Sequence, residues 1–163
     1  MKIVVSNTGP LLHLTEAGYL ELVKLAGEVH IPRAVAVELA GYSLWRIPDW
    51  LTLDELDESY ETDAAMWQQV GLIDAGEAAT IALARQLHAD WLLTDDAAAR
   101  LLAQTLGLEV HGSVGIVIGA AADGHLNKTE AEAALDMLVR SSLWITPRVL
   151  AQARAALVNL FSE

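Results

Sequence analysis

Four short apolar runs, each followed by turn residues and then by a helical pattern, constrain the fold of this 163-residue chain more than any other feature. They span residues 3–5, 28–31, 90–94 and 108–111. Short apolar runs that alternate with helices are typical of a parallel sheet, whose strands are buried because helices cover both faces. The pattern therefore predicts an α/β fold around a central parallel sheet.

The expected helices begin at recognisable signals. Asn127 and Glu130 match a capping box, and Thr146 followed by Pro147 is typical of a helix N-terminus. We expect helices at residues 10–26, 33–40, 74–87, 96–106, 116–122, 129–139 and 147–160. The acidic segment 49–63 has the least regular pattern and is expected to be a surface excursion.

No linker or internal repeat divides the chain, so we expect a single domain of residues 1–163. Its C-terminal helices, at about residues 129–160, are expected to pack on the core or to form a dimer seam. The chain has no cysteine, which rules out disulfides and thiolate metal sites. It has no apolar stretch of spanning length, so we expect a cytoplasmic protein that has no contact with membranes.

The net charge of −12 weakens the case for a nucleic-acid partner. Seven of the acidic residues lie within residues 49–63, where there is no Lys or Arg. Because the rest of the chain is much less acidic, the charge does not exclude such a partner.

Polar tripeptides end two of the expected strands. Ser6-Asn7-Thr8 follows the first run, and Thr94-Asp95-Asp96 follows the third. In an open parallel sheet, ligands bind in the crevice outside the carboxyl ends of the strands. Glu38 and Glu77 lie near the starts of two expected helices and share faces with apolar residues, so we expect both to point inward. Acids from three distant segments are therefore predicted to converge on one rim.

Carboxylates crowded in this way repel one another unless a cation lies between them. A site that offers only oxygen ligands suits Mg²⁺ or Mn²⁺. Such ions can activate a water and stabilise the charge that develops during phosphodiester hydrolysis. The constellation therefore favours a metal-dependent hydrolase.

Each acid also has a structural interpretation. Asp74 and Glu77 match a capping box, which would explain Glu77 without any metal. Asp96, with its neighbour Asp95, could simply cap the helix that follows. Glu38 could be a partly solvated helix residue. Among the other polar residues, Asn7 could stabilise the following turn, and the five histidines show no ligand spacing.

Five segments, in this order and at this spacing, resemble the PIN-domain superfamily, which includes the nucleases of VapC-type toxins. They are VVSNTGPLLHL, VHIPRAVAVEL, DAGEAATIALA, ADWLLTDDAAARLLAQTLGLEVHGSVGIV and DGHL, and they cover about residues 1–126. The branch that the chain most resembles is a prokaryotic one described as predicted nucleic-acid-binding PIN proteins. The resemblance implies a three-layer α/β/α sandwich with a central parallel sheet.

The resemblance also implies site residues. The first acid of the family corresponds to Asn7, the second to Glu38, the helix acid to Glu77, and the acid after the third long strand to Asp96, with Asp95 beside it. Glu38, Glu77, Asp96 and Asn7 would then hold Mg²⁺ or Mn²⁺, and Asp95 would assist them as a fifth catalytic residue.

Supporting roles follow from the same correspondence. Thr8 or Ser6 matches the supporting hydroxyl of the family. Arg100, one turn beyond Asp96, could orient the acids or touch phosphate, and a plain surface salt bridge is the alternative.

Asn7 departs from the family pattern because an amide stands where an acid is expected. Its carbonyl oxygen can bind a hard cation but carries no charge, so it should bind the ion more weakly. Two functions therefore stay open. One is a Mg²⁺- or Mn²⁺-dependent ribonuclease, which could also be the toxin of a toxin–antitoxin pair. The other is a catalytically weak module that binds RNA or a protein partner.

The resemblance favours a homodimer, and an antitoxin protein is the partner expected for the toxin version. A phosphatase of the haloacid-dehalogenase type is rejected, because Asn7 cannot serve as its aspartate nucleophile.

Overall fold

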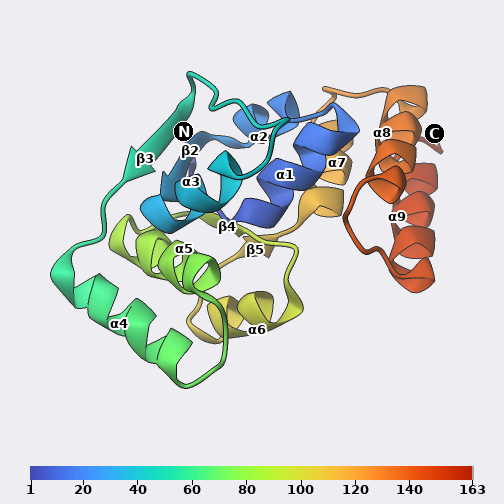
Figure 1. The fold of residues 1–163 in the computed structure, drawn as a ribbon. Helices are drawn as coiled ribbons and strands as arrows, with labels where there is room; N and C mark the ends of the chain where they lie inside the picture. The colour runs from blue at the N-terminus through green and yellow to red at the C-terminus, as the bar shows by residue number, and fades with distance from the viewer. Residues whose placement is uncertain (163) are drawn as a thin grey trace.

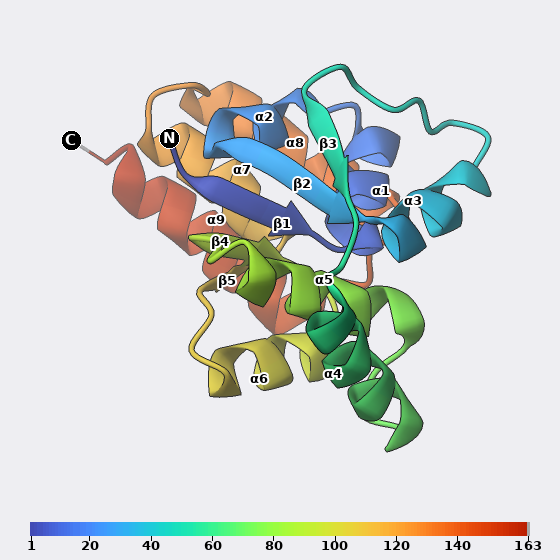
Figure 2. The ribbon, with the colours of Figure 1, turned by 90° about the vertical axis from the view of Figure 1, so that its left-hand side faces the viewer.

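The computed structural model describes residues 1–162, and these contain one five-stranded sheet in which every neighbouring pair of strands is parallel (Figures 1 and 2). The strand order is β3-β2-β1-β4-β5. The strands are β1 (Ile3–Ser6), β2 (Glu28–Pro32), β3 (Leu51–Asp54), β4 (Trp91–Leu93) and β5 (Val110–His111). The predicted central parallel sheet is confirmed.

Helices cover both faces of this sheet (Figure 2). They are α1 (Thr8–Ala17), α2 (Glu21–Ala26), α3 (Arg33–Ala40), α4 (Glu58–Gln69), α5 (Ala75–Gln86), α6 (Ala97–Thr105), α7 (Ser113–Ala122), α8 (Lys128–Arg140) and α9 (Pro147–Leu160). One face carries α4, α5 and α6, and the other carries α1, α2, α7, α8 and α9, while α3 packs against both α1 and α5. This arrangement is the expected three-layer α/β/α sandwich.

Strand β1 lies at the centre of the sheet and supplies a residue to each of the two hydrophobic cores. Val4 packs with α1 and α7 in one core, and its neighbour Val5 packs with α5 and α6 in the other. Neither valine is exposed to solvent. Because successive side chains point to opposite faces of a strand, a continuous apolar run is what a strand covered on both sides requires.

The register of β1 against β4 aligns the carboxyl ends of the two strands. Ser6 is paired with Leu93, and the backbone N–H of Asn7 donates to the Leu93 carbonyl at 2.8 Å. The residue that follows each strand therefore emerges at the same edge of the sheet, next to the starts of α1 and α6.

Residues 49–63 lie largely at the surface, as expected, but they are more regular than their pattern indicated. This segment contains the edge strand β3 and the start of α4. Asp54 of β3 lies 2.5 Å from His30 of β2 through Oδ2 and Nδ1, so the edge strand is held to its neighbour by a side-chain contact as well as by the ladder.

The single helix expected at residues 10–26 is two helices. Gly18 adopts a left-handed backbone conformation, with φ of 84°, and ends α1 before α2 begins. Glycine is the residue that adopts this conformation at little cost, which makes it a common helix terminator.

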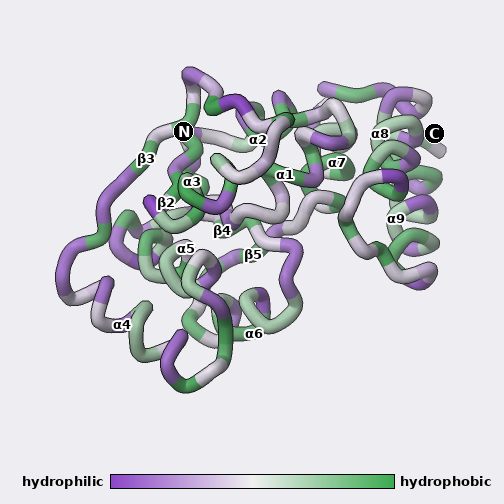
Figure 3. The backbone as a smooth tube through the Cα atoms, in the orientation of Figure 1, coloured by the Kyte–Doolittle hydropathy of each residue, from purple (hydrophilic) through white to green (hydrophobic). Residues whose placement is uncertain are grey.

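The C-terminal helices contribute to the core that contains α1 and α7. Leu135 and Leu138 of α8 and Leu157 of α9 are completely buried there. Figure 3 shows hydrophobic and hydrophilic residues alternating along both helices, as expected for helices with one buried face. No helix within residues 1–162 has the length and apolar character needed to cross a membrane.

Truncating Leu157 tests the attachment of α9 to the core. We expect Leu157→Ala to lower the free energy of unfolding by about 2–5 kcal/mol, because the substitution leaves a cavity in a filled core. Val158→Ala, on the exposed side of the same helix, should change it by less than about 0.5 kcal/mol. Urea unfolding measures both, and equal effects of the two substitutions would contradict the packing of α9.

Candidate functional site

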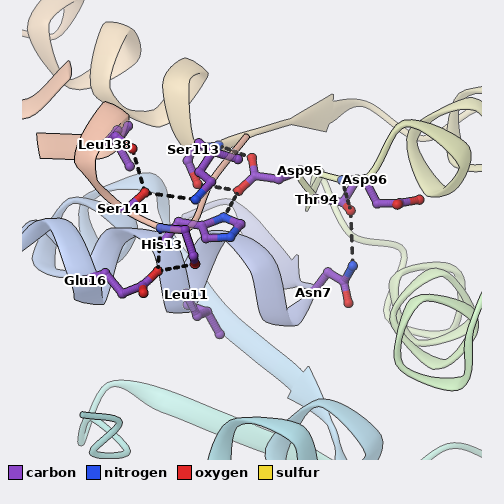
Figure 4. A network of polar contacts seen from close by, with 12 residues as sticks. Asn7, Leu11, His13, Glu16, Thr94, Asp95, Asp96, Ser113, Leu138 and Ser141 are labelled. Atoms are coloured by element: carbon purple, nitrogen blue, oxygen red, sulfur yellow. Dashed lines mark hydrogen bonds and ion pairs between the residues drawn. The ribbon is translucent and has the colours of Figure 1, made fainter. Parts of the chain in front are cut away.

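Asn7 lies directly after β1 and is held at the edge of the sheet by both its backbone and its side chain. Its side chain is buried, and its Nδ2 donates to the hydroxyl of Thr94 at 3.2 Å (Figure 4). The same hydroxyl oxygen accepts from the backbone N–H of Asp96 at 3.2 Å. Thr94 therefore links the residue after β1 to the loop that carries Asp96.

Glu38 reaches this edge from α3. Its Oε2 accepts a hydrogen bond from the Thr8 hydroxyl at 2.7 Å, and its carboxylate lies against Gly76 near the start of α5. A Cβ on Gly76 would overlap Oε1 of Glu38, so glycine is what allows this approach. The positive end of the α5 dipole favours a carboxylate in that place. Glu38 is more exposed than expected, and only its carboxylate turns inward, onto Thr8 and Gly76.

Glu77 and Asp96 interact through their carboxyl groups. Burial raises the pKa of Glu77 to about 8, and the hydrogen bond between its carboxyl and that of Asp96 also raises it. Two carboxyl groups can make that bond only when one of them holds a proton. At neutral pH the pair therefore carries less than two negative charges.

Both acids of this pair also cap helices, as their structural interpretations required. Glu77 accepts from the backbone N–H of Asp74, whose side chain accepts in return, and the two complete a capping box on α5. Asp96 caps α6 by accepting from the backbone N–H of Ala99 at 2.8 Å. These roles fix each carboxyl group close to the other.

Asp95 belongs to a different network from Asp96. Its carboxylate accepts from the backbone N–H of Ser113 at 2.7 Å and from the Ser113 hydroxyl at 2.6 Å. His13 Nδ1 lies 2.7 Å from the same carboxylate, so Asp95 ties the end of β4 to α7 and α1 (Figure 4). The structure thus separates two neighbouring acids that the sequence placed together.

The remaining predicted residues take supporting positions. The Ser6 hydroxyl is fully buried and donates to the Asn7 carbonyl at 2.9 Å. Arg100 lies on the side of α6 that faces β5, and its Nη1 donates to the Val110 carbonyl at 3.5 Å. No salt bridge within residues 1–162 includes Arg100, which removes the salt-bridge interpretation for it.

The predicted convergence is thus partial. Among residues 1–162, no three carboxylate or imidazole side chains lie close enough together to hold a metal ion as placed. Glu77 and Asp96 meet, Glu38 lies against the residue before Glu77, and Asn7 is joined to them through Thr94. Gly76 and Thr94 organise this arrangement. The sequence placed Thr94 at the site only as part of its tripeptide, and it did not single out Gly76, although a glycine inside a helical pattern can have a packing reason.

Gly76→Ala tests whether the approach of Glu38 depends on glycine. Alanine in place of glycine inside a helix normally stabilises it by about 0.5–1 kcal/mol. At position 76 we expect no gain and a loss of the Thr8–Glu38 hydrogen bond, because the added methyl group displaces the carboxylate. Gly119→Ala on α7, where a Cβ meets nothing within 4 Å, should show the normal gain. Thermal melts that show equal gains for both variants would contradict the contact.

The raised pKa of Glu77 predicts how stability depends on pH in the metal-free protein. The native state keeps the Glu77 proton to a higher pH than the unfolded chain does. Binding of this proton therefore stabilises the native state fully below pH 4.5, the ordinary pKa of a glutamate side chain. The stabilisation is lost as the pH rises through about 8, the pKa of Glu77 in the native state. The slope contributed by this group is at most about 1.4 kcal/mol per pH unit, and solvent contact reduces it.

Glu77→Gln keeps the oxygen that accepts from Asp74 but cannot titrate, so it should remove this part of the pH dependence. Urea unfolding of both proteins between about pH 4.5 and 8 measures the difference. If the two proteins lose stability in parallel as the pH rises, the shared proton is not in the native state.

A family model described as a PIN domain matches residues 3–158. Comparison with curated proteins and with solved structures gives no match. The family match takes in the whole sheet and all the side chains at its carboxyl edge, and it agrees with the α/β/α architecture. By its sequence and its fold, the chain belongs to the PIN-domain family.

Proposed function

We propose that this PIN domain is a Mg²⁺- or Mn²⁺-dependent ribonuclease whose centre is the pair Glu77 and Asp96. The observation that carries the proposal is the meeting of these two carboxyl groups at the carboxyl edge of the sheet, where burial and the contact with Asp96 raise the pKa of Glu77. A proton that bridges two acids stands where a cation would otherwise balance their charge. Membership in the PIN-domain family supports a nuclease-type module.

The chemistry of the side chains fits such an ion. The donors are carboxylate and amide oxygens, and Mg²⁺ commonly uses one or two carboxylates with water and substrate phosphate in its remaining positions. Glu77 and Asp96 would bind directly, and Glu38 and Asn7 would complete the set. When bound, the ion would supply an activated water and would stabilise the charge that develops on the phosphate.

The other residues of the site position these four side chains. Thr8 fixes the Glu38 carboxylate, and Thr94 fixes the Asn7 amide. Asp95 anchors the loop that carries Asp96 to the start of α7, so its role in this proposal is positioning. Ser6 acts on Asn7 through its backbone carbonyl.

Within this proposal the finer biological roles are those expected from the resemblance. The domain would act as the toxin of a toxin–antitoxin pair, an antitoxin protein would be its partner, and its assembly would be a homodimer. A catalytically weak module that binds RNA or protein is the second candidate, and the uncharged Asn7 favours it.

Two substitutions test the proposal because each changes the charge of one side chain and keeps its size. Asp96→Asn keeps a good helix cap but removes the carboxylate, so we expect it to abolish metal-dependent RNA cleavage while α6 stays folded. Asn7→Asp adds a carboxylate to the ion site. It should tighten Mn²⁺ binding by about tenfold or more, since one added charge contributes about 1–4 kcal/mol at this kind of distance.

Cleavage of a panel of RNAs, with and without Mn²⁺, measures the first effect, and Mn²⁺-dependent melting measures the second. In the absence of metal, Asn7→Asp should melt below the wild type because a further acid joins the pair. If Mn²⁺ increases neither the stability nor the RNA cleavage of the wild type and of Asn7→Asp, the ribonuclease proposal is overturned in favour of the binding module.

A further inference from the structure

A groove of about 440 Å³ opens beside the acid pair and is separate from it. Asp95 and Ala97 line the groove, and both adjoin Asp96 in the chain. From there it extends past Arg100 to the segment 143–146 that leads into α9. The groove therefore starts next to the proposed centre and leads away over β5 and α7.

Trp144 lies in this groove and is 82% exposed, although tryptophan is normally shielded from water. Its neighbours Leu143 and Ile145 are half-buried against the core that contains α1 and α9. The backbone on both sides of Trp144 is thus anchored while its indole ring faces outward. A large flat ring held at a groove is a surface on which an unpaired nucleobase can stack.

The charge around the groove suits an anionic ligand. Residues 97–162 carry five acidic and five basic side chains, whereas residues 1–96 carry sixteen acidic and five basic ones. Arg100 lines the groove and, among residues 1–162, makes no ion pair. Asp95 also lines the groove, but its carboxylate is already engaged by Ser113. Helices α6, α7 and α9 all begin here, which adds to the positive field of Arg100.

The groove on the opposite side of the site has the reverse character. It is lined by Glu38, Glu55 and Glu61, and its one cation, Arg33, is paired with Glu55. A polyanionic strand that reaches the acid pair would meet repulsion on that side, and on the Trp144 side it would meet the Arg100 guanidinium, which has no ion pair within residues 1–162.

We propose that the groove at Trp144 binds single-stranded RNA next to the scissile phosphate, with Trp144 stacked on an unpaired base and Arg100 donating to a backbone phosphate. Single-stranded RNA is the form selected, because bases within a duplex are already stacked and paired. The inference rests on the proposed function only in placing the scissile phosphate at Glu77 and Asp96.

The test is the binding of a fluorescein-labelled single-stranded RNA of mixed sequence, followed by fluorescence anisotropy without divalent ions so that the strand is not cut. Trp144→Ala should weaken binding about 5- to 100-fold, as expected for the loss of one stacked base. Trp144→Phe should restore most of the affinity. Leu101→Ala, which removes an exposed apolar side chain on α6 outside the groove, should bind as the wild type does.

The outcomes separate this inference from the proposed ribonuclease. Binding that depends on Trp144 and prefers the single strand to the annealed duplex supports the inference even if no RNA is cleaved. Equal binding by the wild type and Trp144→Ala overturns it, whether or not RNA is cleaved. A wild type that does not bind RNA also overturns it. If sedimentation then shows a dimer that Trp144→Ala dissociates, the groove is occupied by a second copy of the chain.

Discussion

The parallel pairing of β1 with β4 is the constraint on which the site depends. Their register places Asn7 and Thr94 side by side, and the hydrogen bond between these side chains joins the first strand to the loop that carries Asp95 and Asp96. Because β1 is the central strand and both of its faces are buried, a shift of its register would exchange the residues of the two cores. The geometry of the edge is therefore as stable as the cores that hold β1.

The second feature of the site is that single side chains serve both local structure and the proposed chemistry. Glu77 completes a capping box on α5 and Asp96 caps α6, so each carboxyl group is fixed at the start of its helix, and the packing of α5 against α6 brings the two together. The local and functional interpretations of these residues are compatible. The cost is the repulsion between two acids, which in the metal-free protein is relieved by a proton, as the raised pKa of Glu77 indicates.

The fold could be predicted from the sequence where hydrophobic pattern and local capping agree. The strand-and-helix alternation located four of the five strands, and the capping signals at Asp74, Asn127 and Thr146 located the starts of three helices. Strand β3 was missed because acidic residues surround it and only Leu51 is buried, so its pattern resembles a loop. The break at Gly18 was missed because apolar residues continue at helical spacing on both sides of it.

The site could be predicted only at the level of segments. Strand ends and helix starts identified which residues reach the carboxyl edge of the sheet, but not the hydrogen-bond partner of each side chain. Asp95 and Asp96 are adjacent in sequence, yet one bonds Ser113 and the other Glu77, because successive residues leave a strand end in different directions. The approach of Glu38 to α5 is possible because Gly76 has no side chain. This contact joins two helices that are distant in the sequence, so the sequence alone does not indicate it.

The central claim is that a cation replaces the proton shared by Glu77 and Asp96. Calorimetric titration of the protein with Mn²⁺ at neutral pH, in buffers of different ionisation enthalpy, measures this exchange directly. Because the pKa of Glu77 is about 8, the account predicts release of about one proton for each ion bound. Mn²⁺ binding with no proton release, or release that persists in Glu77→Gln, would contradict it.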